Sequence, residues 1–98
     1  MSYQQKIQEH LRITLLRLLN EDPDYTMNES LLTDLTESYG FTPSRDRVRT
    51  ELAWLAEQGL VTLDEGNIII AKLTERGADV ARGRVTVPGI KRPSPGRR

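Results

Sequence analysis

Hydrophobic positions in the first half of the chain recur at helical spacing. At 100° per residue, most apolar residues between positions 3 and 19 fall in one stripe: Ile7, Leu11, Leu15, Leu18 and Leu19. This stripe predicts an amphipathic helix that faces a core. A second helix is predicted over about residues 29–39, with Asn28 as its N-cap and Gly40 just after its end. Three leucines of the second helix are expected to point inward: Leu31, Leu32 and Leu35.

A third helix is predicted from Pro43 to Gln58, because Pro suits a first helical position and Gly59 follows the last turn. Its apolar residues have i, i+4, i+7 spacing and are expected to anchor it: Val48, Leu52 and Leu55.

The pattern then changes to strands. One strand is predicted over residues 60–64 and another over 68–73, joined by a turn at Glu65-Gly66-Asn67. A short last helix with Thr74 as N-cap runs to Arg82, and residues 25–27 can add a further short strand.

The link between the second and third helices spans only Gly40 to Pro43, which is typical of a helix-turn-helix. A hairpin follows the third helix directly. The element order therefore predicts a mainly α fold with a small antiparallel β-hairpin, a winged helix-turn-helix of the α+β class.

Two apolar features leave alternatives open. Ile13 and Leu16 lie outside the main stripe of the first helix, so either later helices cover them or a second copy does. The run Ile68-Ile69-Ile70 does not alternate, so both faces of its strand need cover, from Trp54, from residues 85–87 or from a partner. The candidate dimer or partner contacts are therefore Ile13, Leu16 and Trp54.

Composition narrows the function classes. The 98 residues suit one domain, and with no cysteine and one histidine neither a disulfide framework nor a metal cluster is expected. No Gly-rich phosphate loop or nucleophile elbow is present, so we expect neither an enzyme nor a cofactor. Without a long apolar run or a signal-like N-terminus, we expect no membrane partner and a location in the cytoplasm.

Charge divides the chain. Residues 1–42 carry three Lys/Arg against seven Asp/Glu, whereas residues 43–98 carry eleven against seven. From Arg82 onward there are six basic residues and no acidic one. We therefore predict a domain over residues 1–82 and a flexible basic Pro/Gly-rich tail over 83–98.

DNA is the partner that these features favour, because Arg, Ser and Thr side chains on an exposed helix can contact bases and phosphates in the major groove. The candidate residues on the third helix are Ser44, Arg45, Arg47, Arg49 and Thr50. The alternative is that Arg47 pairs with Glu51 and Asp46 with Arg49 in ordinary surface salt links. In the tail, the candidate phosphate contacts are Arg82, Arg84, Lys91 and Arg92.

At Gly59-Leu60-Val61, and again at Leu73-Thr74-Glu75-x-Gly77, the chain resembles the ArsR/MarR-like winged-helix regulators over roughly residues 5–82. Through its ending at residues 85–93 it also resembles the small winged-helix proteins of Mu-like bacteriophages and prophages. The resemblance implies that the third helix enters the major groove and that residues 65–67 form the wing tip. It implies no metal sensing, since the family's metal-binding cysteines are absent here.

The leading expectation is thus a phage or prophage DNA-binding protein that regulates transcription as a homodimer. The alternative is an adaptor that binds a phage or host protein during phage development or assembly. It is favoured by the acidic wing tip, Asp64-Glu65, which phosphates would repel.

Overall fold

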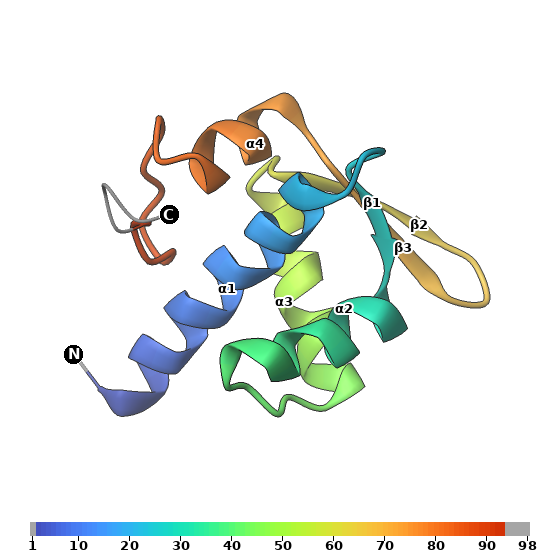
Figure 1. Cartoon of the computed structure of the whole chain (residues 1–98), viewed down its shortest axis with the longest axis horizontal. Coiled ribbons are helices and arrows are strands. Elements are labelled where there is room, and N and C mark those ends of the chain that lie inside the picture. Colours follow the sequence, from blue (N-terminus) through green and yellow to red (C-terminus); the bar gives the residue numbers. More distant parts are fainter. Residues whose placement is uncertain (1, 94–98) are drawn as a thin grey trace.

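Four α-helices and a three-stranded antiparallel sheet make up residues 2–93, the part of the chain that the computed structural model describes (Figure 1). In chain order the elements are α1 (Tyr3–Glu21), β1 (Thr26–Asn28), α2 (Glu29–Thr36), the 3₁₀ helix η1 (Glu37–Tyr39), α3 (Arg45–Glu57), β2 (Val61–Glu65), β3 (Ile69–Leu73) and α4 (Glu75–Ala81). The α+β class and the order of elements agree with the prediction.

Local side-chain caps set the starts of the helices. Asn28 accepts a hydrogen bond from the Leu31 N–H, and Thr74 from the Gly77 N–H, as expected for N-caps. The start of α3 differs from the prediction: Ser44 caps it by accepting from the Arg47 N–H, so Pro43 lies outside the helix. The predicted second helix is shorter as an α-helix, because its last turn tightens into η1. Gly40 ends that turn at a φ of 88°, where a glycine was expected.

The sheet has the strand order β1-β3-β2, so the predicted strand before α2 is confirmed as part of the sheet. β3 pairs with both neighbours and is therefore the central strand of the sheet, and it begins at Ile69 and Ile70. Ile69 packs against the core, whereas Ile68 and Ile70 are only partly buried, so the core covers one residue of the isoleucine run.

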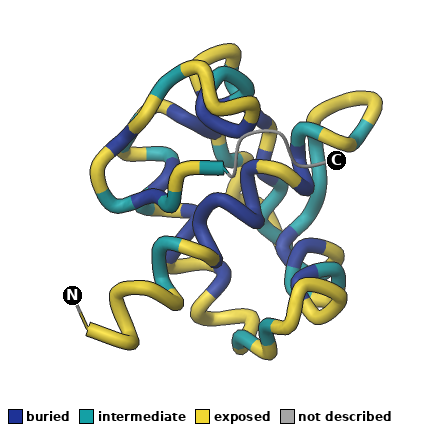
Figure 2. Tube along the Cα trace, turned by 60° about the vertical axis from the view of Figure 1, so that its left-hand side comes forward, coloured by how far each residue is buried: buried dark blue, intermediate teal, exposed yellow. Residues whose placement is uncertain are grey.

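The middle of α1 is buried on most sides and lies at the centre of the domain (Figure 2). Ile13 is 4% exposed and Leu16 0% exposed within the single chain, so neither offers a surface to a partner. Packing within the chain is therefore what covers these two residues, and the dimer contact expected there is corrected. Two residues expected in the core are instead partly open: Ile7 at 36% and Leu31 at 43%.

The domain extends beyond residue 82. Val87 is 5% and Ile90 7% exposed, and both belong to the hydrophobic core. The Lys91 N–H donates to the Glu9 carbonyl, which fixes this segment along α1. The flexible tail predicted from residue 83 is thus wrong for residues 85–91, because two apolar side chains anchor them; residues 94–98 lie outside the described part.

Gly77 allows α4 to approach the link between α3 and β2. A Cβ at this position would lie 2.0 Å from the Leu60 carbonyl oxygen, which also accepts a hydrogen bond from the Thr74 N–H. Within residues 2–93, no helix combines the length and the apolar content needed to cross a membrane.

Candidate nucleic-acid interface

The first two turns of α3 present the predicted DNA-binding residues to solvent. All five are exposed, and only Val48 between them is buried in the core: Ser44, Arg45, Arg47, Arg49 and Thr50. The helical period explains this arrangement, since Val48 begins the stripe that anchors α3 through Leu52 and Leu55.

A buried carboxylate of α2 binds two of the arginines. The Glu29 side chain is 0% exposed, pairs with Arg49 and lies 4.0 Å from the Nε of Arg45. Its second oxygen accepts a hydrogen bond from the Ile69 N–H at 2.7 Å. The Arg49 hydrogen bond, helped by the Ile69 N–H, holds the pKa of Glu29 below its ordinary value although burial acts in the opposite direction. The same pair raises the pKa of Arg49.

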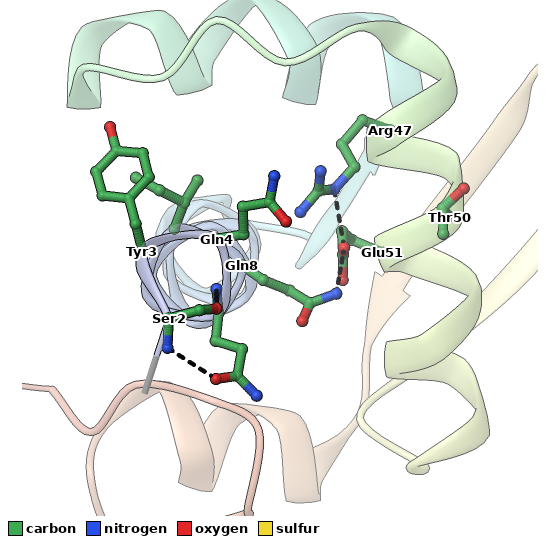
Figure 3. Close-up of a pocket in the computed structure, with 9 residues that line it drawn as sticks. Ser2, Tyr3, Gln4, Gln8, Arg47, Thr50 and Glu51 are labelled. Carbon is green, nitrogen blue, oxygen red and sulfur yellow. Dashed lines mark hydrogen bonds and ion pairs between the residues drawn. The ribbon is translucent and has the colours of Figure 1, made fainter.

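A second buried carboxylate, Glu51, joins α3 to α1 (Figure 3). Its Oε1 accepts from Arg12 Nε at 2.7 Å, and its Oε2 accepts from Arg47 Nε at 3.0 Å and from Gln8 Nε2 at 3.2 Å. The predicted pairing of Arg47 with Glu51 is therefore confirmed. The predicted Asp46–Arg49 pair is wrong, because Arg49 turns to Glu29 instead.

These pairs do not bury the arginines. The side chains of Arg45, Arg47 and Arg49 remain 51%, 43% and 45% exposed, and each contacts its carboxylate through Nε. About half of each side chain thus stays accessible to a ligand, while the carboxylates restrain its direction. Part of the positive charge is offset by the same carboxylates, so the face is only weakly basic.

A groove beside α3 adds residues that the sequence did not single out. It lies between α3 and the first two turns of α1, with Tyr3, Gln4 and Gln8 on one wall and Arg47 and Thr50 on the other (Figure 3). Gln side chains can pair with adenine edges, so this wall adds possible base contacts. The capping box between Ser2 and Gln5 starts α1 here and thereby positions the wall.

Trp54 is used inside the chain. The Arg12 guanidinium lies 3.7 Å from the centre of the Trp54 ring, and Arg12 Nη1 donates to the Gly89 carbonyl at 2.9 Å. Gly89 has a φ of 95°, and a Cβ there would lie 3.0–3.1 Å from Arg12 and the Trp54 ring. Trp54 is half-buried and packs against Arg12 of α1 and Gly89 of the C-terminal segment, so the partner contact expected at Trp54 stays a prediction.

The predicted phosphate contacts of the tail do not join the α3 group. Arg82 and Arg84 follow α4, which lies at the opposite end of the molecule from the first turn of α3 (Figure 1). Arg84 Nη1 lies 3.9 Å from a carboxylate oxygen of Asp79. Lys91 and Arg92 lie beside α1 instead. Asp64 and Glu65 are exposed at the end of the β2–β3 hairpin, so this end of the hairpin is acidic.

Two proteins are similar to the chain over most of its length. The uncharacterized protein gp26 of Escherichia phage Mu is 47% identical over 88 residues, which cover 89% of this chain and 91% of that protein. An uncharacterized protein of Haemophilus influenzae is 41% identical over 78 residues, or 78% of this chain and 76% of that protein. No protein-family model and no solved structure matches the chain. At this identity and coverage, the chain belongs to the family of phage Mu gp26.

Proposed function

We propose that this phage-related protein is a winged helix-turn-helix protein that binds double-stranded DNA and regulates transcription. The observation that carries the proposal is the exposed first half of α3. Arg45 and Arg49 lie on the side of this helix that faces Glu29 of α2, and Arg47 lies on the side that faces α1, while Ser44 and Thr50 stand at the two ends of this stretch. α3 follows α2 after η1 and a short link, as a recognition helix would. The role proposed is binding rather than catalysis.

The restrained arginines favour recognition over loose attraction. An arginine whose Nε is fixed by a buried carboxylate loses less conformational freedom when it meets a base or a phosphate. Glu29 and Glu51 are buried and therefore hold Arg49 and Arg47 before any ligand arrives. We therefore propose that α3 binds DNA mainly through specific side-chain contacts and that the overall charge of the protein adds little to the affinity.

Fluorescence anisotropy with a labelled random duplex at low salt tests the proposal. The affinity is expected to fall steeply with salt, because bound phosphates release counterions. Arg45→Gln is the variant that tests DNA contact most directly, since Arg45 is the most exposed of the three arginines. The Glu29 carboxylate keeps Arg49 as its partner in this variant. It should weaken binding by about 1–3 kcal/mol if Arg45 contacts a guanine edge.

Lys72→Gln is the matched control, because the substitution removes one positive charge at an exposed position of β3, outside the first two turns of α3. No binding of random duplex at low salt by the wild type would contradict the proposal. The regulator is proposed to act as a dimer, and a monomer at every concentration in sedimentation velocity would remove that part.

A protein-interaction adaptor is the second candidate function. It is favoured by the acidic end of the hairpin and by Tyr3, which is 78% exposed beside the half-open Ile7. Under this proposal, the protein does not bind duplex DNA. It binds a specific phage or host protein instead, and the Tyr3→Ala substitution abolishes that binding. Tyr3 is the better probe than Trp54, which supports the fold.

A further inference from the structure

A basic pocket of about 250 Å³ lies between α1, η1 and the C-terminal segment. Its polar side chains include His10 and Arg17 of α1, Tyr39 of η1, and Lys91 and Arg92. We call these five residues the basic pocket. It is separate from the face of α3 described above.

The fold assembles this pocket from three distant parts of the chain. His10 and Arg17 are two helical turns apart on one face of α1, about 10.5 Å along its axis. Ile13 and Thr14 between them are buried and form the floor. The buried Ile90 and the hydrogen bond from the Lys91 N–H to the Glu9 carbonyl hold the third wall in place.

The pocket has positive charge without a counter-charge. No Asp or Glu lines it, and within residues 2–93 none of its basic side chains forms an ion pair. The arginines of α3 differ in this respect, since each has a buried carboxylate. Three cations together with the His10 and Tyr39 donors provide what a phosphate group binds.

We propose that the basic pocket binds a backbone phosphate of the duplex held by α3; the inference rests on the proposed function. A further pocket, lined by Phe41, Pro43 and Arg47 among others, shares Phe41 with the basic pocket and Arg47 with the groove beside α3, so it lies between the two sites. Phosphate contacts position a duplex without reading its base sequence. They would therefore complement base contacts from α3, which can read the sequence.

The experiment compares Arg17→Gln with Lys72→Gln in the same anisotropy assay across a salt series. Arg17 is exposed and has no ion pair in the described chain, so its loss leaves the fold intact. Arg17→Gln should lower the affinity roughly threefold to tenfold and reduce the slope of log affinity against log salt by about one. Lys72→Gln should change neither. Arg92→Gln repeats the test from the other wall.

Two results would overturn the inference alone. In the first, Arg17→Gln and Arg92→Gln both match Lys72→Gln while Arg45→Gln weakens binding. In the second, isothermal titration of the wild type with tripolyphosphate shows binding that Arg17→Gln removes, while the affinity for DNA stays unchanged; the pocket would then serve a small anion. Failure of the wild type to bind duplex at all overturns the proposed function as well, so the two failures are distinguishable.

Discussion

Two buried glutamates explain why three arginines on α3 produce only a weakly basic face. Glu29 is fully buried and binds Arg49 and the Ile69 N–H, and Glu51 binds Arg12 and Arg47. A carboxylate can remain charged in such a place because several donors replace its lost hydration. The two residues therefore serve the fold and, at the same time, direct the side chains proposed to meet DNA.

Glu29→Gln is expected to lower Tm by several degrees, because it leaves Arg49 and Arg45 without their counter-charge while the side chain keeps its size. Thermal unfolding followed by circular dichroism measures the change. Asp34→Asn is the control, since Asp34 is exposed on the same helix. An equal shift in both variants would contradict the role given to Glu29.

The effect of Glu29 should depend on pH. Its folded-state pKa lies below the ordinary value of 4.5, so its stabilising contribution is fully present above that value. The contribution is lost as the pH falls through the lower, folded-state pKa. The difference in unfolding free energy between wild type and Glu29→Gln should therefore narrow on acidification, which denaturant titrations at several pH values can follow.

Gly77→Ala tests the close approach of α4. The new Cβ would lie 2.0 Å from the Leu60 carbonyl oxygen and 2.7 Å from Leu73 Cδ1. Since backbone must move to make room, we expect a loss of about 1–3 kcal/mol or more in urea-unfolding experiments. Gly66→Ala is the matched control, because a Cβ there meets nothing within 4 Å. A stable Gly77→Ala protein would show that α4 can shift freely.

At the scale of elements, the C-terminal segment is part of the core. It is held by Val87 and Ile90 and by the contact of Gly89 with Arg12, which also lies over Trp54. The Arg12 guanidinium of α1 thus contacts α3 and the C-terminal segment at the same time. Loss of the segment should expose both the guanidinium and the ring.

Ile90→Ala is expected to destabilise the protein by about 2–4 kcal/mol, as large-to-small changes in cores do. The emission of Trp54, the one tryptophan of the chain, should shift to the red because the segment beside it loosens. Thr86→Ala, at an exposed position of the same segment, should change neither. Unchanged stability and emission in Ile90→Ala would mean that the segment does not anchor there.

At the scale of the whole molecule, charge is separated although the totals cancel. The chain has 14 basic and 14 acidic residues. The hairpin end is acidic, whereas the basic pocket and the exposed arginines lie on α1, α3 and the C-terminal segment. If DNA lies along α3, the hairpin end is repelled by nearby phosphates and limits the affinity.

Glu65→Lys should therefore strengthen duplex binding and steepen the salt dependence by about one unit of slope, because a cation replaces an anion beside phosphate. The salt series used for the wild type measures both quantities. Glu21→Lys makes the same charge change at an exposed site at the end of α1. Equal gains in the two variants would show that only net charge acts and that the hairpin does not approach DNA.

The sequence by itself determined the features that depend on interactions between residues close together in the chain. Caps such as Asn28 and Thr74, the left-handed Gly40 and the core stripe of α3 depend on neighbours a few residues away, so their patterns predict them. The order of helices and strands follows from the same local rules; the short strand was predicted at residues 25–27, and its pairing with β3 places it at Thr26–Asn28.

The sequence predicted the Arg47–Glu51 pair within α3, but only the tertiary structure decided which charged groups meet across different elements. Arg12 binds Glu51 and Gly89, 39 and 77 residues away, and Glu29 binds Arg49 and the Ile69 N–H, 20 and 40 residues away. A long side chain pairs with whatever group the packing places beside it, and periodicity contains no information about that choice. For the same physical reason the basic pocket, built from α1, η1 and residues 91–93, emerges only when the chain has folded.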